Sequence, residues 1–129
     1  MEKRIKLKLT TISSANPVNV IKGEGLFKQK DAKILITHTD DEQNRTSFII
    51  VDDKITLTRK SPFYELKMPV KQGETLLGIM GEESTFSVIG KGVSYDIQNK
   101  HGRVYLEYTL PDLSEQSTDF KVELEFEFK

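Results

Sequence analysis

The side chains in this sequence with the chemistry to contact a ligand are one arginine, one histidine and three tyrosines: Arg59, His38, Tyr64, Tyr95 and Tyr108. Arg59 continues the alternating face of Ile55 and Leu57, which places it on an apolar face. A guanidinium there must reach water or an acceptor, and it can hold a carboxylate through two parallel hydrogen bonds. Arg59 is therefore the first candidate for a ligand contact. The alternative is a strand-end arginine that extends into solvent.

The two histidines are far apart in the sequence and indicate no metal centre. His38 continues an apolar alternating face and should lie near a rim of the fold, held by hydrogen bonds or half exposed. His101 stands beside Gly102 in a turn sequence and should be exposed. The acidic run 40–42 beside His38 is more typical of a solvated loop than of a ligand set. We expect no metal and no cofactor.

The three tyrosines lie in apolar alternating rows that should line the interior of the fold. These rows are Tyr64-Leu66-Met68-Val70, Val93-Tyr95-Ile97 and Val104-Leu106-Tyr108-Leu110. A phenol on an apolar face needs a hydrogen-bond partner. Tyr95 and Tyr108 therefore either serve a ligand or satisfy each other within a packed core, and core packing is the simpler reading.

Catalysis has little support in the sequence. No serine stands in a nucleophile-elbow sequence, and the chain has no cysteine. The glutamates near the C-terminus fall on the solvent side of their strand, and the interior rows contain no Asp or Glu that could form a carboxylate pair. We expect a protein that is not an enzyme.

The elements that position these residues are strands, because the dominant hydrophobic period is two. At the C-terminus, for example, every second residue of 120–128 is apolar and the residues between are charged. Gly, Asp and Asn turn signals divide the chain into about ten such segments. The segments cover 4–9, 18–30, 33–39, 46–51, 54–59, 63–70, 75–80, 85–97, 103–110 and 120–129, with a loop over 112–118.

A closed sheet accounts best for this many strands, because an open one would expose two long edges. If the first and last strands pair, opposite charges would face each other on the outside of the sheet: cations at 4, 6 and 8 and glutamates at 123, 125 and 127. The alternative is that these are two unrelated solvated faces. Gly23 and Gly25 within one long strand indicate a sharp bend or a close backbone approach. The prediction is a single all-β domain over 1–129, an antiparallel lipocalin-like (calycin) barrel of about 8–10 strands.

Composition limits the partners. The 129 residues suit one domain, and 19 Lys and Arg against 20 Asp and Glu give no basic field for nucleic acid. The charged first residues and the short aliphatic runs give no signal-peptide core and no membrane-inserting segment. Together with the absence of cysteine, this predicts a cytoplasmic protein, and a homo-oligomer remains open.

The order of these segments resembles the YwiB-like family of small bacterial proteins of unknown function. The resemblance rests on the long strand with Gly23 and Gly25, the pair of strands ending at Arg59, the Met68 strand followed by Gln72-Gly73, and the alternating last strand. It implies a calycin barrel and a bacterial cytosolic setting, and it implies no activity. The chain departs from that pattern at Lys60-Ser61-Pro62, where relatives tend to have a small residue and Gly, and at Ile79, where they often have Tyr.

Two functions follow for such a barrel. The first is binding of a small apolar or amphipathic ligand in the interior, which a barrel of about eight or more strands can hold. The second is a packed barrel that binds protein or RNA through its outer surface, for which a patch of Lys60, Lys67, Lys71 and Phe63 is the candidate. An open interior void with Arg59 or a tyrosine at its mouth would favour the first.

Overall fold

The structure, a computed structural model, describes residues 1–111 and 117–129, and all its elements are strands. Most of the loop expected at 112–118 lies outside the described residues, and Ser117 already begins the last strand. The strands are β1 (Glu2–Ser13), β2 (Asn19–Lys30), β3 (Lys33–Thr39), β4 (Arg45–Val51), β5 (Lys54–Lys60), β6 (Glu65–Lys71), β7 (Thr75–Met80), β8 (Ser84–Ile97), β9 (His101–Pro111) and β10 (Ser117–Phe128).

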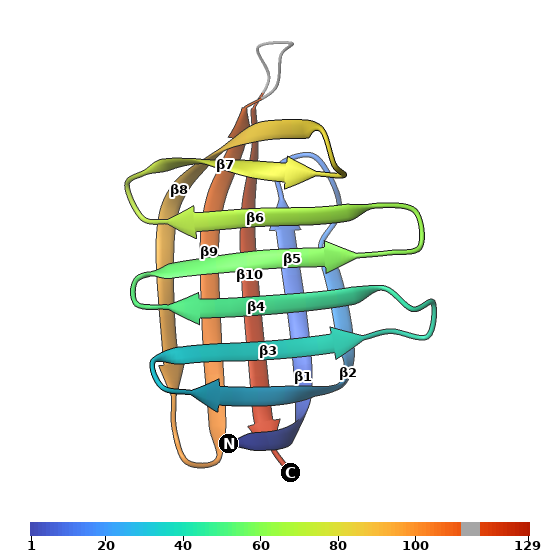
Figure 1. Cartoon of the computed structure of the whole chain (residues 1–129), viewed down its shortest axis with the longest axis vertical. Coiled ribbons are helices and arrows are strands. Elements are labelled where there is room, and N and C mark those ends of the chain that lie inside the picture. Colours follow the sequence, from blue (N-terminus) through green and yellow to red (C-terminus); the bar gives the residue numbers. More distant parts are fainter. Residues whose placement is uncertain (112–116) are drawn as a thin grey trace.

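The ten strands close into an antiparallel barrel in the order β1-β10-β9-β8-β7-β6-β5-β4-β3-β2 (Figure 1). The predicted pairing of the first and last strands is confirmed, with Lys6 opposite Glu127 and Lys8 opposite Glu125. The ion pairs that the glutamates of β10 make are nevertheless with β9, where Arg103 lies 3.3 Å from Glu123 and 3.6 Å from Glu125. All these side chains are on the solvent side, where such pairs contribute little to stability.

The barrel consists of two sheets that cross at a steep angle (Figure 1). β3 to β7 run across one side, and β1, β8, β9 and β10 run along the other. Two long strands belong to both layers. β2 pairs with β1 over 19–28 and with β3 only over 25–30, while β8 pairs with β7 over 84–89 and with β9 from residue 89 onward.

Glycines allow the close backbone approaches where these long strands change partners. A Cβ on Gly25 would lie 2.3 Å from the carbonyl oxygen of Thr37, and a Cβ on Gly90 would lie 2.0 Å from the carbonyl oxygen of Lys71. Any side chain would displace the neighbouring backbone at both positions. The close approach expected at Gly25 is therefore confirmed, and a bulge between Gly90 and Gly92 marks the second turning point.

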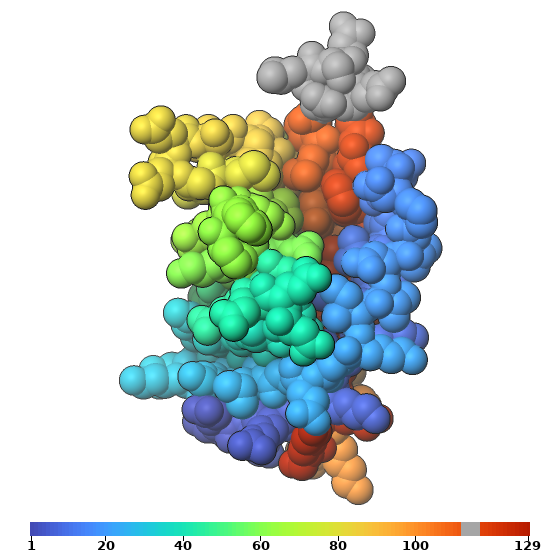
Figure 2. Space-filling model, turned by 90° about the vertical axis from the view of Figure 1, so that its right-hand side faces the viewer, coloured from blue at the N-terminus to red at the C-terminus, as the bar shows by residue number. Residues whose placement is uncertain are grey.

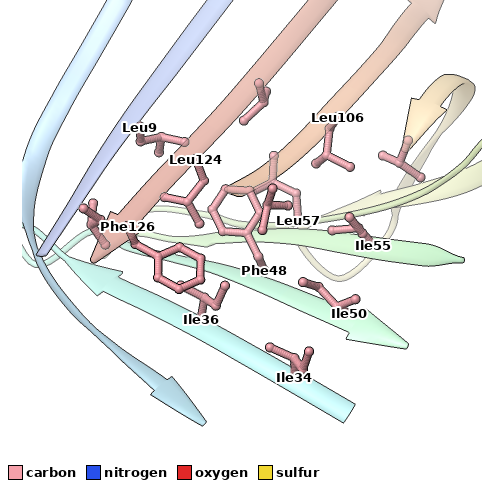
Figure 3. Packing of buried hydrophobic residues seen from close by; sticks show 14 of the residues in the cluster. Leu9, Ile34, Ile36, Phe48, Ile50, Ile55, Leu57, Leu106, Leu124 and Phe126 are labelled. Atoms are coloured by element: carbon pink, nitrogen blue, oxygen red, sulfur yellow. The ribbon is translucent and has the colours of Figure 1, made fainter. Parts of the chain in front are cut away.

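The inward faces of nine of the ten strands, all except β7, contribute to one hydrophobic core. The sticks of Figure 3 come from both sheets and interleave between them, so neither sheet could bury its apolar face alone. Phe27 is fully buried and packs against the rings of Phe126 and Phe128, with centroids 5.9 and 5.0 Å away. This end of the barrel, near the two chain termini, is filled by side chains.

The predicted strand over 63–70 begins later in the structure, at Glu65. The reason is a turn in which the Ser61 hydroxyl oxygen accepts hydrogen bonds from the backbone N–H groups of Phe63 and Tyr64, both at 3.1 Å. Pro62 inside this turn has no N–H to donate to a ladder. Phe63 is left 95% exposed and Tyr64 41% exposed, so Tyr64 does not join the interior row of β6.

Candidate ligand-binding cavity

The barrel has one closed corner and one open corner where its two sheets meet. At the closed corner, backbone hydrogen bonds link Gly73 N–H to the Gly90 carbonyl at 3.0 Å and Gly90 N–H to the Glu74 carbonyl at 2.8 Å. The Tyr95 hydroxyl donates to the carbonyl of Asp52 there, at 3.3 Å. The Tyr95 side chain therefore links β8 to the β4–β5 turn and does not face a cavity.

At the open corner, residues 19–24 of β2 pair with β1 and have left β3. The ends of β4 to β7 face this segment without a shared ladder, and a cavity of about 580 Å³ lies between them and opens to solvent. Figure 2 looks onto this side, where β1 and β2 form the blue wall, β6 and β7 the green to yellow wall, and the orange to red strands β9 and β10 are visible between them.

The cavity has an apolar floor and a polar mouth. Its lining comprises Leu9, Thr11, Asn19, Ile21, Thr46, Phe48, Leu57, Arg59, Leu66, Met68, Met80, Ser84, Thr85, Phe86, Tyr108, Leu110, Pro111, Thr118, Phe120 and Val122. The floor is part of the hydrophobic core, whereas the hydroxyl and amide groups belong to residues near strand ends. Such a combination is typical of small-molecule sites.

Arg59 is the one charged residue among the described residues that line this cavity. It stands opposite Thr46 on β4 and Leu66 on β6, and its side chain is exposed at the mouth. Within the described part of the chain, no carboxylate lies close enough to Arg59 to form an ion pair. As far as residues 1–111 and 117–129 go, its guanidinium therefore has no anionic partner.

Tyr108 lies on the opposite wall, on β9, and is 3% exposed. Its ring stacks on Phe120, with centroids 5.1 Å apart and planes 14° apart. Burial raises the pKa of the Tyr108 phenol to about 12. The hydroxyl thus keeps its proton at neutral pH and is a hydrogen-bond donor at the cavity wall.

His38 has a structural place at the edge of the open corner. Its Nδ1 lies 2.8 Å from the carbonyl oxygen of Glu24, which accepts the hydrogen bond and ties β3 to β2 where the two strands separate. A Cβ on Gly23 would meet the imidazole at 2.6 Å, so the ring packs directly on the β2 backbone. His38 and the exposed Tyr64 do not line the cavity.

The acidic loop beside His38 forms a hydrogen-bonded turn. One carboxylate oxygen of Asp40 accepts from the backbone N–H groups of Glu42 and Asn44, both at 2.9 Å. These bonds, led by the one from the Asn44 backbone, hold the pKa of Asp40 below its usual 3.8. Over residues 1–111 and 117–129, no group of three or more His, Asp or Glu side chains is arranged to hold a metal ion.

Of the five residues singled out in the sequence, the structure brings Arg59 and Tyr108 into one cavity and places His38, Tyr64 and Tyr95 outside it. The polar groups at the mouth were not singled out in the sequence. Thr46 could have been found, because it stands directly across the ladder from Arg59. Ser84 lies further along the same ladder row, through Leu66 and Met80. Asn19 could not have been found, because it belongs to the part of β2 that has left β3, and only the crossing of the two sheets brings it to this cavity.

Comparison with known proteins gives a fold and no activity. No protein-family model matches the sequence, and no curated protein matches it. The crystal structure of the ywiB protein from Bacillus subtilis superposes with a TM-score of 0.82 over 99% of this chain and 93% of that one, at 12% sequence identity. The chain has a YwiB-like fold. At this identity the likeness extends to the fold alone. Among the described residues, no helix has the length and apolarity needed to cross a membrane.

Proposed function

We propose that this protein is a non-enzymatic binding protein that holds a small amphipathic acid in the open-corner cavity. The observation that carries the proposal is a single unpaired cation, Arg59, at the mouth of an otherwise uncharged, mainly apolar cavity of about 580 Å³ among the described residues. An apolar ligand body would replace water on the floor, and a carboxylate would meet the guanidinium at the rim.

The volume and the charge support this ligand class over others. A cavity of about 580 Å³ falls within the roughly 300–1,000 Å³ of typical ligand sites. A neutral apolar ligand would leave Arg59 unused, and a cation would be repelled by it. Within this proposal, the fold is a lipocalin-like (calycin) barrel, and the protein works in the bacterial cytoplasm, in keeping with its lack of cysteine.

Replacing Arg59 should weaken ligand binding far more than it changes stability. We expect Arg59→Gln to raise the Kd for dodecanoate about 10- to 100-fold, because a hydrogen bond to a charged group contributes roughly 1.5–3 kcal/mol. The Tm should stay almost unchanged, because Arg59 is exposed. Isothermal titration calorimetry measures the first quantity and thermal denaturation the second.

The matched control is Arg45→Gln, at the end of the neighbouring strand and outside the cavity lining. It should leave the affinity for dodecanoate unchanged, and dodecanol should bind the wild-type protein more weakly than dodecanoate does. Equal loss of affinity in both arginine variants would assign the effect to general surface charge and would contradict the proposed site.

A second candidate function is self-association through the outer face of β3 to β7. Leu35, Ile49, Thr56 and Pro69 form an uncharged row across four strands of this face. Beyond the row, Leu77 is 64% exposed and Ile79 is 44% exposed. The basic patch expected around Phe63 has less support, since Lys71 lies 3.9 Å from Asp53 and 3.4 Å from Glu74.

The partner that suits this row is a second copy of the chain, because the same uncharged row on each copy can meet across a two-fold axis. If the chain dimerises there, sedimentation velocity should show a concentration-dependent dimer, and Leu77→Lys should shift it to the monomer by burying a charge in the interface. A wild-type protein that sediments as a monomer at every concentration would remove this candidate.

A further inference from the structure

The cavity contains a second polar group that a simple fatty acid would leave unused. Tyr108 lines the cavity, and only 3% of its surface is exposed to solvent. The hydroxyl groups of Tyr95 and Tyr105 donate hydrogen bonds, to the Asp52 carbonyl and the Glu107 carboxylate. The hydroxyl of Tyr108 has no such partner among the described residues.

The Tyr108 hydroxyl has no protein partner but is not sealed inside the wall, because the one fully buried side-chain polar atom without a partner among the described residues is Nε2 of His38. Phenylalanine would fill the same space and stack equally well on Phe120, whose ring lies parallel to that of Tyr108 at 5.1 Å. The hydroxyl therefore adds nothing to packing and gives the wall of the open cavity one hydrogen-bond donor. A water molecule or a ligand oxygen in the cavity is the available acceptor.

The two polar groups occupy different walls of the cavity. Arg59 is near the end of β5 in one sheet, whereas Tyr108 is on β9 in the other, next to Gly90 of β8 and Phe120 of β10. Leu57, Phe48 and Met68 supply apolar surface between them. A ligand that satisfies both groups needs an anion at one point and an uncharged oxygen acceptor at another, joined by an apolar chain.

We propose that the cavity selects an oxygenated long-chain acid, with its carboxylate on Arg59 and a hydroxyl or keto oxygen of its chain accepting a hydrogen bond from Tyr108. This inference rests on the proposed function and narrows its ligand class. Arg59 then provides affinity for any amphipathic acid, and Tyr108 is the residue that distinguishes oxygenated acids from plain ones.

The test compares dodecanoate with a set of hydroxydodecanoates that carry the hydroxyl at mid-chain or terminal carbons, against the wild-type protein and Tyr108→Phe. At least one hydroxy acid should bind the wild-type protein about 2- to 10-fold more tightly than dodecanoate, which corresponds to one additional neutral hydrogen bond. Tyr108→Phe should abolish this preference, so that the ratio of the Kd values for dodecanoate and the preferred hydroxy acid falls to about 1. The ¹³Cζ resonance of Tyr108 should move with the preferred hydroxy acid and stay in place with dodecanoate.

The outcomes separate the two proposals. If dodecanoate binds in an Arg59-dependent manner but every hydroxy acid binds equally well or less well, and Tyr108→Phe changes nothing, the role of Tyr108 is overturned while the proposed function stands. If no acid binds the wild-type protein, the proposed function fails and the selectivity fails with it. Since the variant keeps the aromatic ring, an unchanged near-ultraviolet circular dichroism spectrum shows that the fold is retained.

Discussion

Phe27→Ala should lower the free energy of unfolding by about 3–5 kcal/mol, the range for removing a buried phenylalanine. Phe27 has no exposed surface and supports the rings of Phe126 and Phe128, so its loss would leave a void between β2 and β10. For a domain of this size the Tm should fall by roughly 10–20 °C. Urea denaturation and differential scanning calorimetry measure these two changes.

The control is the same substitution at an exposed phenylalanine. Phe63 is 95% exposed at the tip of the β5–β6 turn, so Phe63→Ala should change the free energy of unfolding by roughly 0.5 kcal/mol or less. Similar losses in the two variants would mean that the filled end of the barrel is not the main hydrophobic core, contrary to the packing described above.

Gly90→Ala should be the most damaging single-methyl substitution, lowering the free energy of unfolding by about 2–3 kcal/mol, near the upper end of typical overpacking costs. The new Cβ would lie 2.0 Å from the carbonyl oxygen of Lys71, which belongs to the backbone and cannot rotate away. Moving it would also disturb the hydrogen bonds of Gly90 with Gly73 and Glu74 that close this corner of the barrel.

Gly92→Ala is the matched control, because its nearest neighbours would be 3.6 Å from the added Cβ, an ordinary contact distance. We expect its stability to stay within roughly 0.5 kcal/mol of the wild-type value. Chemical denaturation of both variants tests the comparison. A Gly90→Ala protein as stable as Gly92→Ala would show that β8 does not turn against β6 in this way.

The strands and their closure could be predicted because they follow from local alternation. The pattern of residues 120–128 fixes which side of β10 is inside, and the opposite charges at Lys6 and Glu127 indicate its partner. The start of β6 was misplaced because the alternating row of Tyr64 continues through a turn that is set by a hydroxyl, Ser61, rather than by hydrophobicity.

The cavity could be predicted only in part. Periodicity indicated that Arg59 and Tyr108 face inward, but alternation says nothing about whether the interior is full. The sequence left a hollow and a packed interior both open, and the structure is filled at one end and hollow at the other. That difference depends on where β2 leaves β3, which is a long-range feature of strand pairing.

Tyr95 and His38 show the same limit. Tyr95 lies on the expected face of its strand, yet its hydroxyl donates a hydrogen bond to a turn 43 residues away in sequence, at Asp52. His38 lies inward at a rim as expected, yet its Nδ1 is hydrogen-bonded to the carbonyl oxygen of Glu24. Glu24 is next to Gly25, the ladder partner of His38, whereas Asp52 is brought near Tyr95 only by the crossing of the two sheets.

The most direct test of the central claim is to map where dodecanoate binds by ¹H–¹⁵N and methyl NMR of the wild-type protein. We predict that the largest shift changes occur at lining residues from both sheets, such as Leu9, Leu57, Leu66 and Leu110. The acyl chain should give intermolecular contacts to these methyl groups. Residues on the outer face, such as Leu77 and Ile79, should not change. Changes confined to that outer face, or no saturable changes at all, would contradict a ligand inside the barrel.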